Sequence, residues 1–136
     1  MKLTGKGKKV LGISDAESSR HGGAAHQYWV KRIADHLRTC GYKVAEEAPI
    51  GGGKAVDILA AKDGRRIAFE IETGKSDAAA NVRKCLEAGF SKVVVVASSA
   101  AVRDALEKSL AGRRNVRVMT GPEALARISG GPAGPV

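Results

Sequence analysis

The sequence contains few of the residues on which covalent or metal cross-linking depends. Its 136 residues include two cysteines, Cys40 and Cys85. They form no Cys-x-x-Cys pair and have no adjacent histidine pair, so neither a zinc site nor a disulfide framework is indicated. Each stands at the end of an expected helix among apolar neighbours, which predicts buried free thiols in a reducing cytosol.

Long apolar runs and aromatic residues are also scarce. No stretch approaches the ~20 apolar residues of a transmembrane helix, and the amino end lacks the apolar region of a secretory signal. We therefore expect a soluble, cytoplasmic protein with no membrane partner. Aromatic residues make up 4% of the chain, and Tyr28-Trp29 is its aromatic-rich spot. Base stacking on single-stranded nucleic acid is thus not expected as the main mode of binding.

Positive charge, by contrast, is in excess. Lys and Arg total 23 against 14 acidic residues, which gives a formal net charge of +9 and an isoelectric point near 9.9. A surplus of this size favours polyanionic partners, of which nucleic acid is the commonest, although many soluble proteins are basic without binding DNA. A run of lysines stands near the amino end: Lys2, Lys6, Lys8 and Lys9. We expect DNA to be the partner.

Composition divides the chain into an arm, one domain and a tail. Residues 1–22 are rich in Gly, Lys and Ser with little periodicity, so we expect a flexible basic arm there. Residues 129–136 contain Gly and Pro and are expected to form a flexible tail. The remaining segment, 23–128, is long enough for a single domain with its own core.

Apolar periodicity predicts alternating helices and strands within this domain. Helices are expected over residues 23–40, 77–88 (with Ser76 as the cap), 100–110 and 122–128, and strands over 42–48, 56–61, 67–72, 92–97 and 115–119. The valine run at 92–97 is typical of a strand buried on both faces. The order is α-β-β-β-α-β followed by α-β-α. It predicts an α/β fold whose mixed sheet is antiparallel at its start and parallel later, with helices on both faces.

A hairpin brings together acidic residues from two of these strands. The strands are separated by a segment containing Asp63-Gly64, and Asp-Gly is a strong signal for a two-residue hairpin turn. With this turn, counting back along both strands places Asp57 directly opposite Glu70. Glu72, two residues further on, points to the same face as Glu70. The opposite face is expected to be apolar and to carry Val56, Ile58, Ile67, Phe69 and Ile71.

Three carboxylates within roughly 5–8 Å on one sheet face repel one another and destabilise the sheet. The arrangement is reasonable if a cation binds there, and oxygen ligands suit a hard divalent ion such as Mg²⁺ or Mn²⁺. The alternative is a solvated acidic face paired with Arg65, Arg66 or nearby lysines. We take the metal site as the working prediction.

The element order, with Asp57 on the second strand and Glu70-Ile71-Glu72 on the third, resembles the PD-(D/E)XK nuclease superfamily, which has the restriction-endonuclease-like fold. The resemblance covers about residues 22–97. In size and charge the chain is most similar to the small, homodimeric archaeal-type Holliday junction resolvases. The resemblance implies a Mg²⁺- or Mn²⁺-dependent endodeoxyribonuclease. It also implies that Asp57, Glu70 and the Ile71 carbonyl bind metal, with Glu72 as a further ligand or base.

Two positions depart from the family pattern. Val56 replaces the motif proline, which is a common variation. Glu72 stands where the motif has a lysine that positions or deprotonates the attacking water and stabilises charge on the phosphate. A glutamate can do only the first of these. Lys75 either returns the missing ammonium to the site as a catalytic residue or is a solvated turn lysine.

Other polar residues are candidates by their position. His26 falls where many family members place a metal-binding glutamate, so it is a candidate ligand, general base or phosphate contact. The alternative is a core-edge histidine bonded to a backbone carbonyl. His21 lies before the expected helix. Asn81 and Lys84, on the outward side of the next helix, match a region near the site in RecB-type nucleases. The candidate DNA contacts are Lys6, Lys8, Lys9, Lys54, Asn81 and Lys84.

Three functions therefore remain open. The leading one is a metal-dependent DNA endonuclease. The second is a nuclease-fold module without catalysis that binds DNA or a partner, and the missing motif lysine supports it. The third is a nucleotide-binding domain that uses Gly51-Gly52-Gly53-Lys54, but this run lacks P-loop spacing and precedes a strand rather than a helix.

Overall fold

The computed structural model describes residues 23–74 and 77–128. Several predictions fall outside these ranges and have no structural counterpart here: the arm at 1–22 with Lys6, Lys8, Lys9 and His21, the residues Lys75 and Ser76, and the tail at 129–136. Within the described ranges, no helix combines the length and the apolar character needed to cross a membrane.

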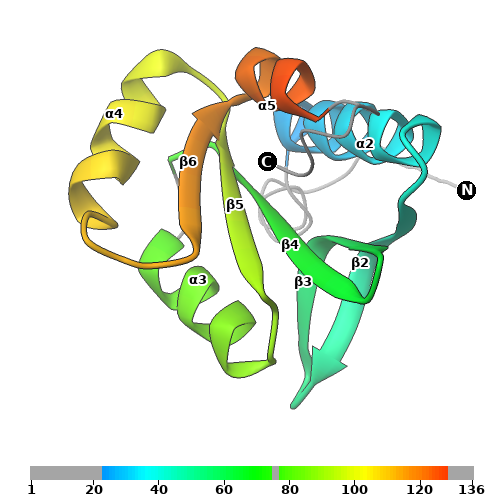
Figure 1. Ribbon diagram of the computed structural model, residues 1–136. Coiled ribbons are helices and arrows are strands. Elements are labelled where there is room, and N and C mark those ends of the chain that lie inside the picture. The colour runs from blue at the N-terminus through cyan, green and yellow to red at the C-terminus, as the bar shows by residue number, and fades with distance from the viewer. Residues whose placement is uncertain (1–22, 75–76, 129–136) are drawn as a thin grey trace, which may run out of the picture.

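Helices and strands follow one another in the predicted order. They are α2 (Ala24–Thr39), β2 (Lys43–Gly51), β3 (Lys54–Lys62), β4 (Arg65–Glu72), α3 (Ala78–Glu87), β5 (Lys92–Ala97), α4 (Ala100–Ser109), β6 (Val116–Thr120) and α5 (Gly121–Arg127). The strands form one five-stranded sheet in the order β2-β3-β4-β5-β6 (Figure 1). β2, β3 and β4 are antiparallel neighbours, whereas β4, β5 and β6 run parallel. The predicted mixed α/β sheet is confirmed.

Helices cover both faces of the sheet, as predicted. α2 and α5 pack on one face over a core that includes Ile33, Leu37 and Phe69, and we call this the α2/α5 face (Figure 1). α3 and α4 pack on the other face, which we call the α3/α4 face. The second core lies there and includes Val82 and Cys85 of α3. Residues 93–97 of β5 are fully buried between the two layers. The valine run is therefore covered on both sides, as its sequence indicates.

The hairpin between β3 and β4 has the predicted register. Asp63 and Gly64 both have positive φ angles, of 54° and 78°, as a type I′ turn requires. Lys62 pairs with Arg65, and the ladder continues to the pair Ile58–Phe69. The next positions along the register are Asp57 and Glu70.

Val56 does not share a face with Ile58, contrary to the prediction. It lies in the α3/α4 core, whereas Ile58 lies in the α2/α5 core. The reason is an irregularity between them: the ladder of β2 and β3 passes over Glu47 and Asp57, and Glu47 has a φ angle of 48°. The regular geometry of β2 is therefore interrupted at Glu47, opposite Asp57, and the alternation of side chains along β3 is broken between Val56 and Ile58.

Three smaller predictions were also wrong. β2 continues through Pro49 to Gly51, where a loop was expected; the proline is tolerated because β2 is an edge strand. α3 is capped by Asp77, whose side chain accepts a hydrogen bond from the Ala80 N–H, and not by Ser76. Cys40 is half-buried rather than buried, whereas Cys85 is buried as expected.

Candidate active site

Asp57 is joined by one hydrogen bond to Glu70 and by another to Ile71, at the point where β3 leaves its regular pairing with β4. The Asp57 N–H donates to Glu70 Oε2 at 3.0 Å, and the Ile71 N–H donates to Asp57 Oδ2 at 2.8 Å. Each bond joins the backbone of one strand to a carboxylate of the other. The sequence prediction that the hairpin brings these two acids together is confirmed.

Glu70 is a buried carboxylate with little stabilisation of its charge. Its exposed fraction is 3%. The pKa of Glu70 is raised to about 7, first because burial disfavours the charged form and then because Asp57 repels it. Lys84 and the Asp57 N–H oppose this rise without cancelling it. The site therefore favours the protonated form of Glu70 more than water does.

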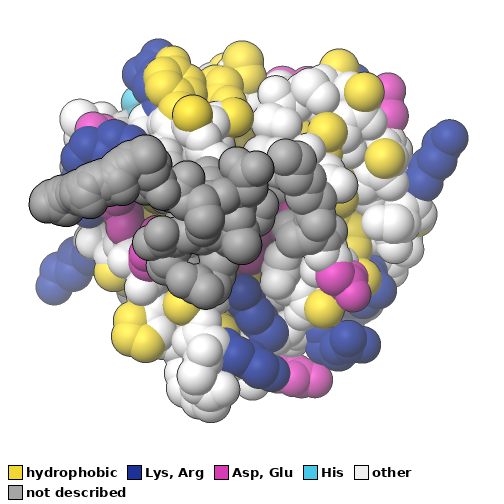
Figure 2. Space-filling view, turned by 180° about the vertical axis from the view of Figure 1, so that it is seen from behind, with side chains coloured by type: hydrophobic (Ala, Val, Ile, Leu, Met, Phe, Trp, Pro, Cys, Tyr) yellow, Lys and Arg dark blue, Asp and Glu magenta, His cyan; other side chains and the backbone are white. Residues whose placement is uncertain are grey.

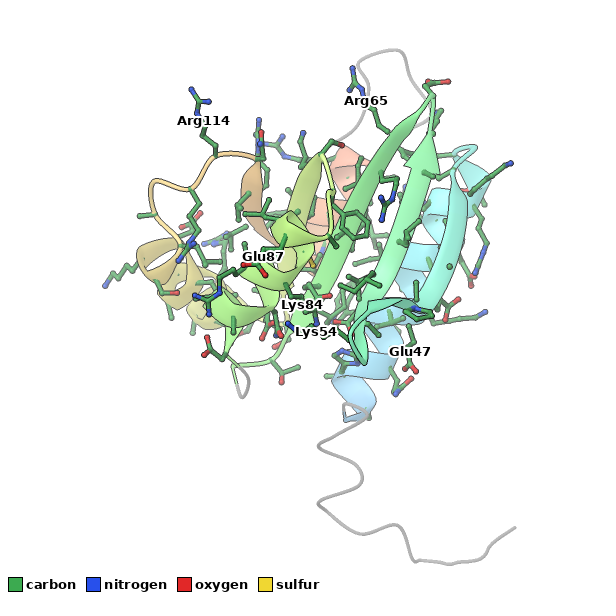
Figure 3. All side chains as sticks on the ribbon, turned by 90° about the horizontal axis from the view of Figure 1, so that it is seen from below. Glu47, Lys54, Arg65, Lys84, Glu87 and Arg114 are labelled. Atoms are coloured by element: carbon green, nitrogen blue, oxygen red, sulfur yellow. The ribbon has the colours of Figure 1, made fainter. Side chains whose placement is uncertain are left out.

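Lys84 provides the positive charge next to Glu70. Its Nζ lies 3.5 Å from Glu70 Oε1, and its side chain is 19% exposed. Figure 3 places Lys84 on α3, at the end of the sheet away from Arg65, the first residue of β4. Lys84 therefore faces the sheet and not outward as predicted, whereas its contact with DNA stays a prediction.

Glu72 also contacts α3, through a hydrogen bond instead of an ion pair. It is 2% exposed, and its Oε2 accepts a hydrogen bond of 3.0 Å from Asn81 Nδ2. Asn81 thus also faces the sheet and not outward as predicted. Both contacts follow from the positions of these residues in the sequence. Asn81 and Lys84 are three residues apart, so they share one face of α3, and they meet residues two apart on one face of β4.

His26 reaches Asp57 from the beginning of α2. Its Nε2 lies 3.1 Å from Asp57 Oδ2, and its side chain is 15% exposed. The hydrogen bond to Asp57 raises the pKa of His26, although burial opposes the rise. The partner of Nε2 is thus a carboxylate and not the backbone carbonyl of the alternative interpretation. The buried Nδ1 has no hydrogen-bond partner among the described residues.

The three carboxylates do not form a single ligand cluster. Within residues 23–74 and 77–128, no three His, Cys, Asp or Glu side chains are grouped so that they could hold a metal ion. Asp57 and Glu70 contact each other, whereas Glu72 is bonded to Asn81 on α3. Glu72 as a third ligand beside Asp57 and Glu70 therefore stays a prediction.

Asp57 and Glu70 nevertheless fit a hard divalent ion. Mg²⁺ keeps several water ligands and is commonly bound by only one or two carboxylates together with substrate phosphates. Glu70 Oε1 lies 3.5 Å from Lys84 Nζ. This is longer than the hydrogen bond of 3.0 Å that Glu70 Oε2 accepts from the Asp57 N–H. The Ile71 N–H points toward β3, so its carbonyl points there too. A cation at this place would relieve the repulsion that raises the pKa of Glu70.

The remaining candidate, Lys54, is exposed at the start of β3, after a turn formed by Gly51, Gly52 and Gly53 with positive φ angles. Other Lys and Arg side chains lie at several separate places on the visible part of the face in Figure 2. The contact of Lys84 with Glu70 is the feature that the sequence reasoning missed. The signal for it is the three-residue spacing of Asn81 and Lys84, which matches the two-residue spacing of Glu70 and Glu72 across α3 and β4.

No family model matches the chain, and no curated protein matches it. Among solved structures, a match is found with the crystal structure of a protein of unknown function, AF1548, at 13% sequence identity and a TM-score of 0.47. The match covers 66% of this chain and 56% of that chain, which is little more than half of the other protein's length. A likeness this remote carries no functional information.

Proposed function

We propose that the protein is a metal-dependent DNA endonuclease of the PD-(D/E)XK type, with a restriction-endonuclease-like fold. The observation that carries the proposal is the pair Asp57 and Glu70, bonded across the end of the β3–β4 hairpin. Glu70 is almost fully buried, and its pKa is raised to about 7. Two repelling carboxylates in such a place reduce stability, and strongly perturbed groups of this kind are concentrated at functional sites.

Asp57, Glu70 and the Ile71 carbonyl are the groups that would hold Mg²⁺ or Mn²⁺. When bound, such an ion lowers the pKa of a water ligand and neutralises the scissile phosphate. His26 holds Asp57 in place through Nε2, and its Nδ1 is left to accept or donate a proton. Asn81 fixes the carboxylate of Glu72, which can orient an attacking water.

The charge of the chain supports DNA as the substrate. A formal net charge of +9 attracts a polyanion and favours contacts to the phosphate backbone. Contacts to the phosphate backbone carry no base sequence, so binding of this kind favours selection of DNA structure over DNA sequence. We therefore extend the proposal to a junction-resolving enzyme that acts as a homodimer.

The alternative is a nuclease-like module that binds DNA or a partner without cutting. One observation favours it: Lys84 already neutralises Glu70 in part, so the acid pair can persist in the fold without a metal. Glu72 in place of the motif lysine points the same way. The two functions differ in metal dependence, because a non-catalytic module has no need to bind Mn²⁺.

The test is cleavage of linear, flapped, single-stranded and four-way-junction DNA by the purified protein in Mg²⁺ or Mn²⁺. We expect Asp57→Ala and Glu70→Ala to lose about 10²-fold or more in rate, because each removes a metal ligand. Glu87→Ala is the matched control, since Glu87 is an exposed acid on α3 (Figure 3). Parental rates in the first two variants would rule out this site. A parent that cuts no DNA form with either ion would favour the non-catalytic module.

A further inference from the structure

The ammonium of Lys84 occupies the position next to the carboxylate oxygen that a metal would use. Its Nζ is 3.5 Å from Glu70 Oε1, whereas Glu70 Oε2 is bonded to the Asp57 N–H. Lys84 lowers the pKa of Glu70 against the effect of burial. A cation is therefore already placed at the acid pair by the fold itself.

The position of Lys84 is fixed by the way α3 packs on the sheet. Val82 and Cys85 are fully buried on the α3/α4 face, on either side of Lys84 along the helix. Asn81, one turn earlier, holds Glu72 by a hydrogen bond of 3.0 Å. The rotation of α3 relative to β4 is thus set by two apolar anchors and one polar contact. Lys84 points at Glu70 as a consequence of this rotation.

An ammonium and a divalent ion compete for one carboxylate oxygen, because their like charges repel at such a distance. Lysine has a flexible four-carbon chain that lets the charge move while the backbone stays in place. The Lys84 side chain is 19% exposed, so solvent lies within its reach. An ammonium that leaves Glu70 is free to bind another anion, and a DNA phosphate is the anion that the proposed function brings to this site.

We propose that Lys84 is an exchangeable counter-ion of the acid pair. Without metal it neutralises Glu70, and once a divalent ion binds Asp57 and Glu70 it turns to the phosphodiester of the bound DNA. This proposal rests on the proposed function for its second half only. It assigns to α3 the cation that the strand lacks at Glu72, and it does not need Lys75.

The test is titration of the full chain with Mn²⁺ alone, followed by calorimetry, together with single-turnover cleavage. We expect Lys84→Met to bind Mn²⁺ on the order of 10-fold more tightly than the parent, because the competing charge is gone. The same variant should cleave about 10²-fold more slowly, because a group that stabilises the phosphate is lost. Lys84→Arg keeps the charge and should retain parental Mn²⁺ affinity.

Arg83→Met is the matched control, since it removes one positive charge from an exposed position next to Lys84 on α3. It should change neither Mn²⁺ affinity nor cleavage. Should Lys84→Met fail to fold, Lys84→Gln repeats the measurement with a polar side chain beside Glu70.

Equal or weaker Mn²⁺ binding by the Lys84→Met or Lys84→Gln variant would overturn the counter-ion assignment. Parental cleavage by that variant would overturn the phosphate contact. A parent that binds Mn²⁺ without cutting any DNA contradicts the proposed function, and tighter binding by the variant would then still support the exchange of Lys84 for a metal.

Discussion

The two faces of β4 differ in the kind of side chain that they bury. On the α2/α5 face, Ile67, Phe69 and Ile71 pack into an apolar core. On the α3/α4 face, Ala68 is followed by Glu70 and Glu72, which are as deeply buried as the isoleucines. One strand therefore contributes hydrophobic stabilisation on one side and two buried carboxylates on the other.

The difference separates what holds the fold together from what the fold positions. Burial of apolar surface stabilises a protein without requiring specific partners. Buried carboxylates cost free energy unless hydrogen bonds and opposite charges accompany them, and here the partners come from α3 and from the Asp57 N–H. We infer that the apolar side chains on the α2/α5 face of β4 stabilise the fold, whereas the two carboxylates on its α3/α4 face reduce stability and are kept for a functional role.

The largest expected effect on stability is on the apolar face. Phe69 is fully buried, so Phe69→Ala should lower the free energy of unfolding by about 3–5 kcal/mol, through lost transfer free energy and a cavity. Urea denaturation measures the change. Tyr28→Ala serves as the control: Tyr28 is 55% exposed and its ring contacts Trp29 edge-on, so the cost should stay below about 1.5 kcal/mol. A loss at Phe69 no larger than at Tyr28 would contradict the division between the faces.

On the acid face, the second prediction concerns pH. The folded pKa of Glu70, about 7, is above the ordinary value of 4.5, so the folded state holds its proton more tightly than the unfolded state. This favours folding at low pH, and the advantage is lost as pH rises from 4.5 through 7. At pH 8, Glu70→Gln should therefore be more stable than the parent by up to roughly 3 kcal/mol.

The measurement is the free energy of unfolding of both proteins from pH 4 to 8, without divalent ions. The two curves should meet at the acidic end. Exposed Glu87, changed to Gln, is the control and should follow the parent at every pH. A Glu70→Gln variant less stable than the parent at pH 8 would mean that the charged form of Glu70 is favoured by the fold.

The smallest of the three effects lies where α5 meets α2. A Cβ at Gly121 would be 2.4 Å from the ring of Trp29, so Gly121→Ala forces the indole or α5 to shift. We expect a cost of about 1–3 kcal/mol in unfolding free energy, as for other overpacked sites. Gly23→Ser is the matched control because a Cβ there meets nothing within 4 Å and serine is a favourable N-cap residue. Equal stability of Gly121→Ala and the parent would show that the α2–α5 contact is loosely packed.

The sequence was sufficient for the features that depend on local patterns. The order of elements follows from periodicity, and the meeting of Asp57 with Glu70 follows from a two-residue turn whose register can be counted. The spacing of Asn81 and Lys84 puts both residues on one side of α3, but it does not say which side faces the sheet. That depends on the rotation of α3 relative to β4, which is set by the burial of Val82 and Cys85. Val56 was misplaced because the distortion at Glu47 leaves no mark in the hydrophobic pattern.

The hairpin also has a consequence for the order of folding events. Asp57 and Glu70 are 13 residues apart, and a short loop with a favourable turn closes at small entropic cost. α3 packs on both β4 and β5, and the parallel pairing of these two strands is a non-local contact that forms slowly. We therefore expect the two carboxylates to meet while water still surrounds them. The arrival of α3 both dehydrates Glu70 and delivers its lysine, so the charge is desolvated and compensated in one step.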